Sequence, residues 1–290
     1  MAQRVVILAG HRRSLSSIAL TWGLSQLSSS VVRIVGVVCV SEFTWRRVMQ
    51  WRRRLGGGLV QRVISELGMS QGGRFDDERE VYLQRLQAAR VPHRNLQSLC
   101  RELGVPCKVV HNINDLSSVR HVESMDIDYA IYSGAGILRK PLIESTRKGV
   151  LNLHCGPLPH VRGMNAAEWS LFLGLIPEVT LHHIDSGIDT GKIIDSRLVP
   201  IQRGEVLGRI RARVVTAGLD LLIDTLPITE ESGGRQNPIA SGRQYYSMTD
   251  SIKATVQGWV NEGITPTTTS EATDPNDLRN ALQRTLRKSA

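Results

Sequence analysis

An asparagine and a histidine stand two positions apart in residues 150–154, where apolar and polar residues alternate (VLNLH). In a strand, alternate side chains lie on one face, so Asn152 and His154 should project together. The strand should end at Gly156 and Pro157, because proline lacks a backbone donor. Pockets of open α/β sheets form where strands end. An amide donor and an imidazole that titrates near neutral pH would meet there.

A second group of reactive side chains lies in residues 183–191 (HIDSGIDTG), directly after the apolar run at 179–182. The loop carries two carboxylates, Asp185 and Asp189, and its glycines allow a sharp bend. It could therefore hold an acid near an imidazole. Taken alone, each motif also has an ordinary structural interpretation. The asparagine–histidine pair is typical of a hydrogen-bonded core pair, and the loop is typical of a turn.

Together and in this order, the motifs resemble the 10-formyltetrahydrofolate-dependent formyltransferase family. Its members formylate methionyl-tRNA, glycinamide ribonucleotide or the amino sugar of a nucleotide. The family pattern is N-x-H, L-P, R-G, a histidine and then D-x-G-x-D-x-G. In this chain its positions are filled by Asn152, His154, Leu158-Pro159, Arg162-Gly163, His182 and residues 185–191. The resemblance covers residues 110–226 well, the first strands loosely, and the segments 45–62 and 227–290 hardly at all.

This resemblance implies an N-formyltransferase that uses 10-formyltetrahydrofolate as co-substrate. Asn152 would donate its amide to the developing oxyanion, and His154 would stabilise the same charge or take the amine proton. Asp189 would fix the imidazole tautomer, hold a water and relay the proton. The chemistry requires no metal, and no His/Cys/Asp set has zinc spacing. A non-catalytic relative that only binds folate is the competing interpretation.

The resemblance also implies a folate site. The turn at residues 134–138 would contact the pterin ring through the backbone of Gly136, Ile137 and Leu138, although a plain tight turn is equally compatible. Asp185 would shape the folate pocket. His182 would orient the acidic loop or serve as a buried structural histidine.

The resemblance further implies that the first turn of the chain, Gly10 to Ser14, faces the acceptor. A strand followed by a glycine turn and a helix start offers backbone donors to an anion. Arg12 and Arg13 are candidate phosphate clamps there, or else solvated arginines at a helix start. Arg162 follows the L-P turn, where it would form a salt bridge or contact the substrate.

Buried apolar runs alternate with helical segments, which predicts an α/β, doubly wound, mostly parallel sheet of the Rossmann-like type that the family has. Strands are expected at residues 4–9, 32–40, 109–110, 126–132, 150–154, 179–182 and 197–201. Helices are expected at 15–27, 79–86, 96–103, 140–145, 166–175, 205–226 and 252–259. Residues 1–226 would form the catalytic domain. Residues 227–290 would be a small irregular extension, partly disordered, with one extended element at 243–248.

A strongly basic insertion is expected at about residues 45–90. Six arginines surround two tryptophans and three glycines within residues 45–62, and no acid is present. The segment is typical of a solvated or interface helix, or else of a basic lid over an anionic acceptor. The net charge of +9 also suits an anionic partner, but it does not separate a sugar nucleotide from tRNA.

We expect a small anionic amine as the acceptor, an amino-sugar nucleotide or a specialised metabolite, in preference to methionyl-tRNA. The reason is that residues 227–290 offer one short extended element and a polar tail, whereas tRNA needs a long contact surface. The four cysteines show no C-x-x-C spacing and are interpreted as reduced thiols. No signal peptide or membrane-spanning run is expected, so a cytoplasmic location is predicted.

Overall fold

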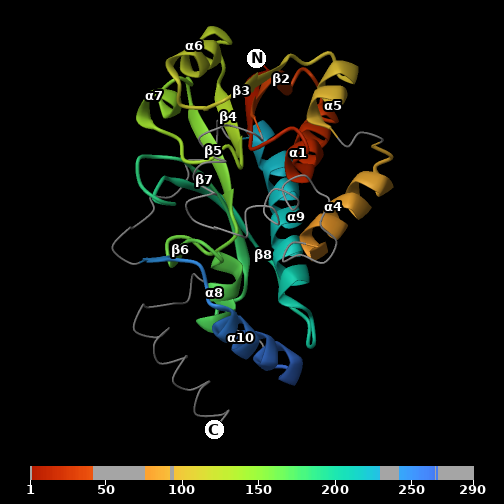
Figure 1. Cartoon of the computed structure of the whole chain (residues 1–290), viewed down its shortest axis with the longest axis vertical. Helices are drawn as coiled ribbons and strands as arrows, with labels where there is room; N and C mark the ends of the chain where they lie inside the picture. Colours follow the sequence, from red (N-terminus) through yellow and green to blue (C-terminus); the bar gives the residue numbers. More distant parts are fainter. Residues whose placement is uncertain (1, 42–75, 92–94, 229–241, 265, 267–290) are drawn as a thin grey trace, which may run out of the picture. The chain divides into compact units, whose positions relative to one another are not determined.

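The computed structural model describes residues 2–41, 76–91, 95–228, 242–264 and 266 (Figure 1). The arginine-rich segment 45–62 and the tail from residue 267 therefore lie outside the described residues. The chain divides into two compact units, residues 1–148 and 149–290. The domain boundary predicted at residue 226 stays a prediction.

The first unit is built on four parallel strands in the order β3-β2-β1-β4. They are β1 (Gln3–Ala9), β2 (Val32–Val40), β3 (Cys107–Val110) and β4 (Tyr129–Ser133). The last five residues of β1 are fully buried, as expected for a central strand whose two faces are both covered. Parallel neighbours need helical crossovers, and the helices supply them. The predicted α/β fold with a mostly parallel sheet is confirmed.

Five helices are described in this unit: α1 (Leu15–Ser25), α4 (Asp76–Ala88), α5 (Leu96–Glu102), α6 (Leu116–Ser124) and α7 (Lys140–Ile143). Helix α1 contacts α4 and α5, and α6 contacts α7. Figure 1 shows α6 and α7 to the left of the strands and α1 and α5 to the right. The side chain of Ser14 caps α1 by accepting from Ser17 N, and Asn95 caps α5 through Gln97 N. The start of each of these two helices is thus determined by a capping residue in the sequence.

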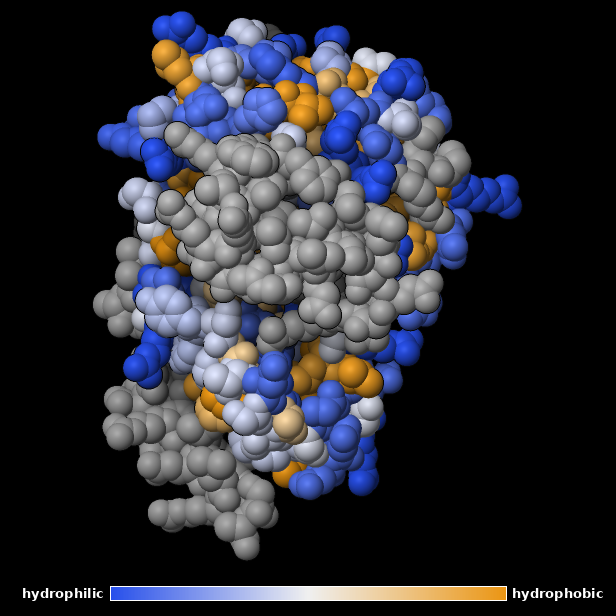
Figure 2. Space-filling view, viewed as in Figure 1, coloured by the Kyte–Doolittle hydropathy of each residue, from blue (hydrophilic) through white to orange (hydrophobic). Residues whose placement is uncertain are grey.

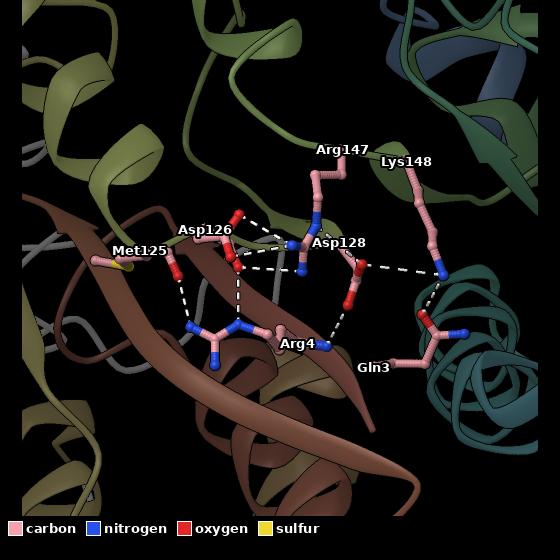
Figure 3. Close-up of polar contacts among 7 residues, drawn as sticks. All are labelled: Gln3, Arg4, Met125, Asp126, Asp128, Arg147 and Lys148. Atoms are coloured by element: carbon pink, nitrogen blue, oxygen red, sulfur yellow. Dashed lines mark hydrogen bonds and ion pairs between the residues drawn. The ribbon is translucent and has the colours of Figure 1, made fainter. Parts of the chain in front are cut away.

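A polar network ties the beginning of β1 to the loop before β4 (Figure 3). Asp128 accepts from Arg4 N at 2.8 Å and from Arg147 Nε at 3.2 Å. Arg147 also binds Asp126 through Nη1 at 3.0 Å. The side chain of Asp128 is only 12% exposed, whereas that of Asp126 is 69% exposed. Most of the network's contribution to stability should therefore come from Asp128.

We expect Asp128→Asn to lower the free energy of unfolding by about 1.5–3 kcal/mol, because hydrogen bonds to a shielded charge are lost and an amide faces donors. Asp126→Asn is the matched control. It keeps a residue that tolerates the positive φ of 48° at this position and removes only an exposed charge. This control variant should lower the free energy of unfolding by less than about 1 kcal/mol. Urea denaturation of both variants measures the difference, and equal costs would contradict this account of the network.

Two cysteines that are seven positions apart in the sequence meet at the end of α5. Cys100 is buried in that helix, and Cys107 begins β3. A hydrogen bond between the two thiols and burial raise the pKa of Cys100, whereas the same hydrogen bond and the charge of Arg12 lower the pKa of Cys107. The sequence showed separate thiols, and the turn between α5 and β3 brings these two together.

The second unit contains three antiparallel strands in the order β5-β7-β8. They are β5 (Gly149–His154), β7 (Glu178–His183) and β8 (Ile193–Leu198). Helix α9 (Leu207–Thr225) packs on all three, followed by the short 3-10 helix η2 (Leu226–Ile228). The strand expected at residues 197–201 is wrong in its bounds, since β8 begins four residues earlier. It starts at Ile193 because that residue pairs with His182 across the loop.

A small second sheet was missed by the sequence: β6 (Val161–Gly163) pairs in parallel with β9 (Arg243–Tyr245). Three residues between turns carry no strand periodicity, and the partner lies about 80 positions away. The extended element expected at 243–248 is present, but its regular part ends at Tyr245.

An aromatic series anchors residues 242–264 to the second unit. The rings of Trp169 and Tyr245 lie 4.9 Å apart, those of Trp169 and Phe172 lie 5.6 Å apart, and Phe172 stacks on Trp259 at 5.7 Å. They join α8 (Ala166–Phe172), β9 and α10 (Asp250–Glu262). Such pairs add to the burial of apolar surface. The extension is therefore packed on the unit that carries the N-x-H motif.

The coloured surface in Figure 2 is largely hydrophilic, and its hydrophobic residues form small scattered groups. The large apolar side chains with most exposure include Ile137 in the first unit and Tyr246 in the second. Among the described residues, no helix is both long and apolar enough to cross a membrane.

Candidate active site

The asparagine and histidine of β5 face a second histidine and an aspartate. The antiparallel register places Asn152 opposite His182, and the Asn152 Nδ2 lies 3.0 Å from the His182 Nε2. His154 Nδ1 lies 3.4 Å from Asp189 Oδ2. The predicted trio Asn152, His154 and Asp189 is thus gathered in one place with His182 among them.

Asp189 is held at this place by its backbone and by a neighbouring loop. It adopts a positive φ of 53°, which the bend of its glycine-containing loop requires. Its Oδ2 accepts from the backbone N of Gly163 at 2.8 Å, and its Oδ1 lies 3.7 Å from His182 Nε2. The carboxylate keeps 15% of its side-chain surface exposed, against 6% for His154 and 1% for His182. Asp189 is therefore the most exposed of these three side chains.

The orientation of the His154 ring is fixed from both sides. Its Nε2 lies 2.7 Å from the carbonyl oxygen of Val161, which can only accept, so Nε2 is a donor. Its Nδ1 then faces the Asp189 carboxylate. In the neutral ring Nδ1 carries the lone pair, so it can take up a proton as a general base beside a carboxylate that stabilises the charged ring.

His182 is a site residue that the sequence analysis had placed only as an orienter of the loop or a structural histidine. Burial, reinforced by the charge of His154 and opposed by that of Asp189, lowers its pKa to about 4. The sequence already indicated that His182 belongs to the site, because the family pattern includes a histidine three residues before the acidic loop. The cross-strand register with Asn152 was not visible in that pattern.

The R-G step of the motif has a structural reason. Gly163 has a φ of +94°, and a Cβ on it would lie 2.2 Å from the carbonyl oxygen of Tyr245. That carbonyl accepts from Met164 N at 3.0 Å. Only glycine can therefore keep β6 against β9 while its own N–H holds Asp189.

Arg162, predicted to form a salt bridge or contact substrate, donates from Nη2 to the carbonyl of Gly242 at 3.2 Å. Its Nε is buried and has no hydrogen-bond partner among the described residues. The exposed carboxylate of Asp185 accepts from Gly187 N at 3.0 Å and from the hydroxyl of Thr190, so it shapes its own loop. Substrate contact by Arg162 and folate contact by Asp185 stay predictions.

The other predicted residues lie in the first unit. Gly136 has a φ of +87° and open space where a Cβ would stand, and Ile137 is 79% exposed. Asn114 holds this turn: its Nδ2 donates to Ile137 O at 2.9 Å and its Oδ1 accepts from Arg139 N at 2.8 Å. Leu138 continues the same open turn. Asn114 was not among the site residues predicted from the sequence.

The first turn of the chain lies against the same loop region. Gly10 N donates to Ser133 O at 2.9 Å, and a Cβ on Gly10 would lie 2.5 Å from Gly134 O. A close approach of two backbones therefore requires glycine at position 10. Arg13 is exposed, and Arg12 is partly buried, with no hydrogen-bond partner for its Nε in the part of the chain that the structure describes. Their contact with a phosphate stays a prediction.

No cluster of three or more His, Cys, Asp or Glu within the described segments could hold a metal ion.

Comparison with known proteins gives three findings. Residues 111–226 match the family model described as formyl transferase, and this range includes Asn152, His154, His182 and Asp189. Methionyl-tRNA formyltransferase from Listeria innocua is 30% identical over 128 residues, which are 43% of this chain and 41% of that protein. The chain thus spans less than half the length of this curated relative.

Two solved structures share the fold. Phosphoribosylglycinamide formyltransferase from Anaplasma phagocytophilum superposes with a TM-score of 0.53 at 19% identity, covering 80% of this chain and 89% of that one. A sugar N-formyltransferase from Shewanella sp. FDAARGOS_354 gives 0.53 at 16% identity, covering 88% and 87%.

Proposed function

We propose, from the premise that residues 111–226 form a formyl transferase family domain, that this chain is an N-formyltransferase. It transfers a formyl group from 10-formyltetrahydrofolate to the amine of a small, anionic acceptor. The observation that carries the proposal is the gathering of Asn152, His154 and Asp189 around one point, within the matched range. A core pair without chemical function would not require an aspartate in a positive-φ loop beside it.

Each residue has a distinct task in this reaction. Formyl transfer to an amine builds negative charge on the formyl oxygen and leaves a surplus proton on the attacking nitrogen. Asn152 Nδ2 carries two hydrogens; one points to His182, and the second donates to the developing oxyanion. His154 Nδ1 takes up the proton that the attacking amine loses, Asp189 stabilises the charged ring, and the proton is returned to N10 of the tetrahydrofolate as the bond from N10 to the formyl carbon breaks.

The open turn at Gly136 fits the flat ring of the folate. Among the described residues, no atom beyond the two chain neighbours of Gly136 lies within 4 Å of the place where a Cβ would stand, so a planar group can approach the backbone there. Asn114 keeps the turn rigid through two hydrogen bonds. We propose that Gly136, Ile137 and Leu138 contact the folate, and that Gly10, Arg12, Arg13 and Arg162 serve the acceptor.

Two acceptor classes compete. The relative named methionyl-tRNA formyltransferase favours tRNA, but it is matched over only 41% of its length. We favour a small amine such as an amino-sugar nucleotide or a specialised metabolite. The support is that residues 242–248 fold back on the site loop, with Arg243 N bonded to His160 O and Trp169 Nε1 to Tyr246 O. This segment is thus bonded to the stretch that follows the N-x-H motif, and it would form part of the acceptor site.

The acceptor class is tested by turnover and by salt. We expect release of tetrahydrofolate with a saturable anionic amine, and weak binding of initiator methionyl-tRNA. A tRNA held by many phosphate contacts would lose affinity by about 10³–10⁵ between about 50 and 200 mM salt, whereas a small anion depends far less on counterion release. Tight, salt-steep tRNA binding with formyl-methionine formed on it would overturn the small acceptor. Folate binding without any turnover would favour the non-catalytic alternative.

A further inference from the structure

We propose that His182 is a positioning residue that selects the orientation of the Asn152 amide, so that its NH₂ group and not its carbonyl oxygen faces the reacting formyl group. The inference rests on the proposed function and extends it to a residue that would act through Asn152. The structure supports it through two hydrogen bonds at opposite nitrogens of one ring.

The tautomer of His182 follows from its first hydrogen bond. Its Nδ1 lies 2.7 Å from the backbone oxygen of His183. A carbonyl oxygen can only accept, so Nδ1 must carry the hydrogen. In the neutral ring the other nitrogen, Nε2, is then an acceptor with a lone pair.

The ring stays neutral because it is buried. His182 is 1% exposed, and burial lowers its pKa to about 4. The titratable groups that act on it are His154, which lowers the pKa, and Asp189 and Asp185, which raise it. Burial has the largest effect, so near neutral pH the Nε2 atom has no hydrogen.

The second hydrogen bond transmits this state to Asn152. Its Nδ2 lies 3.0 Å from His182 Nε2, so the amide donates and the imidazole accepts. A flipped amide would place Oδ1 against the Nε2 lone pair, which leaves two buried acceptors facing each other. The antiparallel pairing of Asn152 with His182 holds the two residues opposite each other, so the orientation of the amide is set by this hydrogen bond.

The same tautomer separates His182 from the proton path. Its Nε2 lies 3.7 Å from Asp189 Oδ1, but the lone pair on this nitrogen already accepts the hydrogen bond from Asn152 Nδ2, so Nε2 is not available to take up a proton while that bond is made. The proton route is thereby confined to His154 and Asp189. His182 acts only through Asn152.

A double-mutant cycle tests this dependence. His182→Phe keeps an aromatic ring and removes both nitrogens, so kcat should fall roughly ten- to a hundredfold with little change in the acceptor KM. The kcat of Asn152→Ala should be lower still, and the kcat of the double variant should equal that of Asn152→Ala alone. Multiplying losses in the double variant would overturn the proposal, because His182 would then act independently. An unchanged kcat for Asn152→Ala would instead contradict the proposed function.

A spectroscopic measurement decides the point even if His182→Phe does not fold. In the wild-type protein with ¹⁵N-labelled histidine, His182 should show a proton on Nδ1 and none on Nε2 at neutral pH. Asn152→Asp places a carboxylate against Nε2, so the ring should take up a second proton and its pKa should rise. A proton on Nε2 of the wild-type ring, or no rise in the Asn152→Asp variant, would refute the tautomer argument irrespective of the reaction.

Discussion

Asp189→Asn should lower kcat for formyl transfer by roughly two to four orders of magnitude, and His154→Ala should do the same. The Asp189 carboxylate accepts the Gly163 N–H at 2.8 Å and faces His154 Nδ1 at 3.4 Å. An amide at this position keeps the shape of the side chain. It cannot accept the proton that the amine must lose or stabilise charge on the imidazole ring. The release of tetrahydrofolate in the presence of an accepted amine measures the loss.

Ser186→Ala provides the control for this pair of variants. Ser186 is exposed in the same loop, so its replacement should leave kcat within a few-fold of wild type. Circular dichroism and thermal melting establish that the slow variants are folded. If His154→Ala and Asp189→Asn both match wild type, the enzyme assignment is wrong.

Gly163→Ala should both destabilise the protein and impair catalysis. The new Cβ would lie 2.2 Å from Tyr245 O, and a φ of +94° strains any residue other than glycine. We expect a loss of roughly 2–4 kcal/mol in the free energy of unfolding. We also expect kcat to fall about 10²-fold, because the N–H that holds Asp189 must move when β6 separates from β9. Urea denaturation and steady-state kinetics measure the two effects.

Gly204→Ala isolates the contribution of the backbone conformation. Gly204 has a φ of +74°, but no atom of the described residues beyond its two chain neighbours lies within 4 Å of the place that a Cβ would occupy. Only conformational strain of about 1–2 kcal/mol should therefore appear. Its kcat should be unchanged. Equal destabilisation in the two variants would show that the contact with Tyr245 is unimportant. A wild-type kcat in a folded Gly163→Ala variant would show that the pairing of β6 with β9 does not affect catalysis.

The fold class and most elements could be predicted because their signals are local. A fully apolar run over residues 5–9 indicates a central strand, and the caps Ser14 and Asn95 mark helix starts within one turn. The pair Asn152 and His154 could be assigned to one face from the two-residue period of a strand alone. The acidic loop could be recognised from its glycines and carboxylates.

The missed strands show where such signals end. β6 and β9 contain three residues each, which is too short for any period to register. Their pairing exists because the aromatic contact of Trp169 with Tyr245 and the backbone bonds of residues 160–164 favour it. The bounds of β8 likewise follow from its pairing with β7 and not from its own residues.

By itself, the sequence determined which residue types the site would contain, which face of β5 would carry two of them and the α/β order of the elements. The tertiary structure alone decided what each polar atom binds. His154 Nε2 is held by Val161, Asp189 by Gly163, and the amide of Asn152 by His182. The reason is physical: periodicity records which side of an element is buried, whereas hydrogen-bond partners are chosen by strand register and close packing between distant segments.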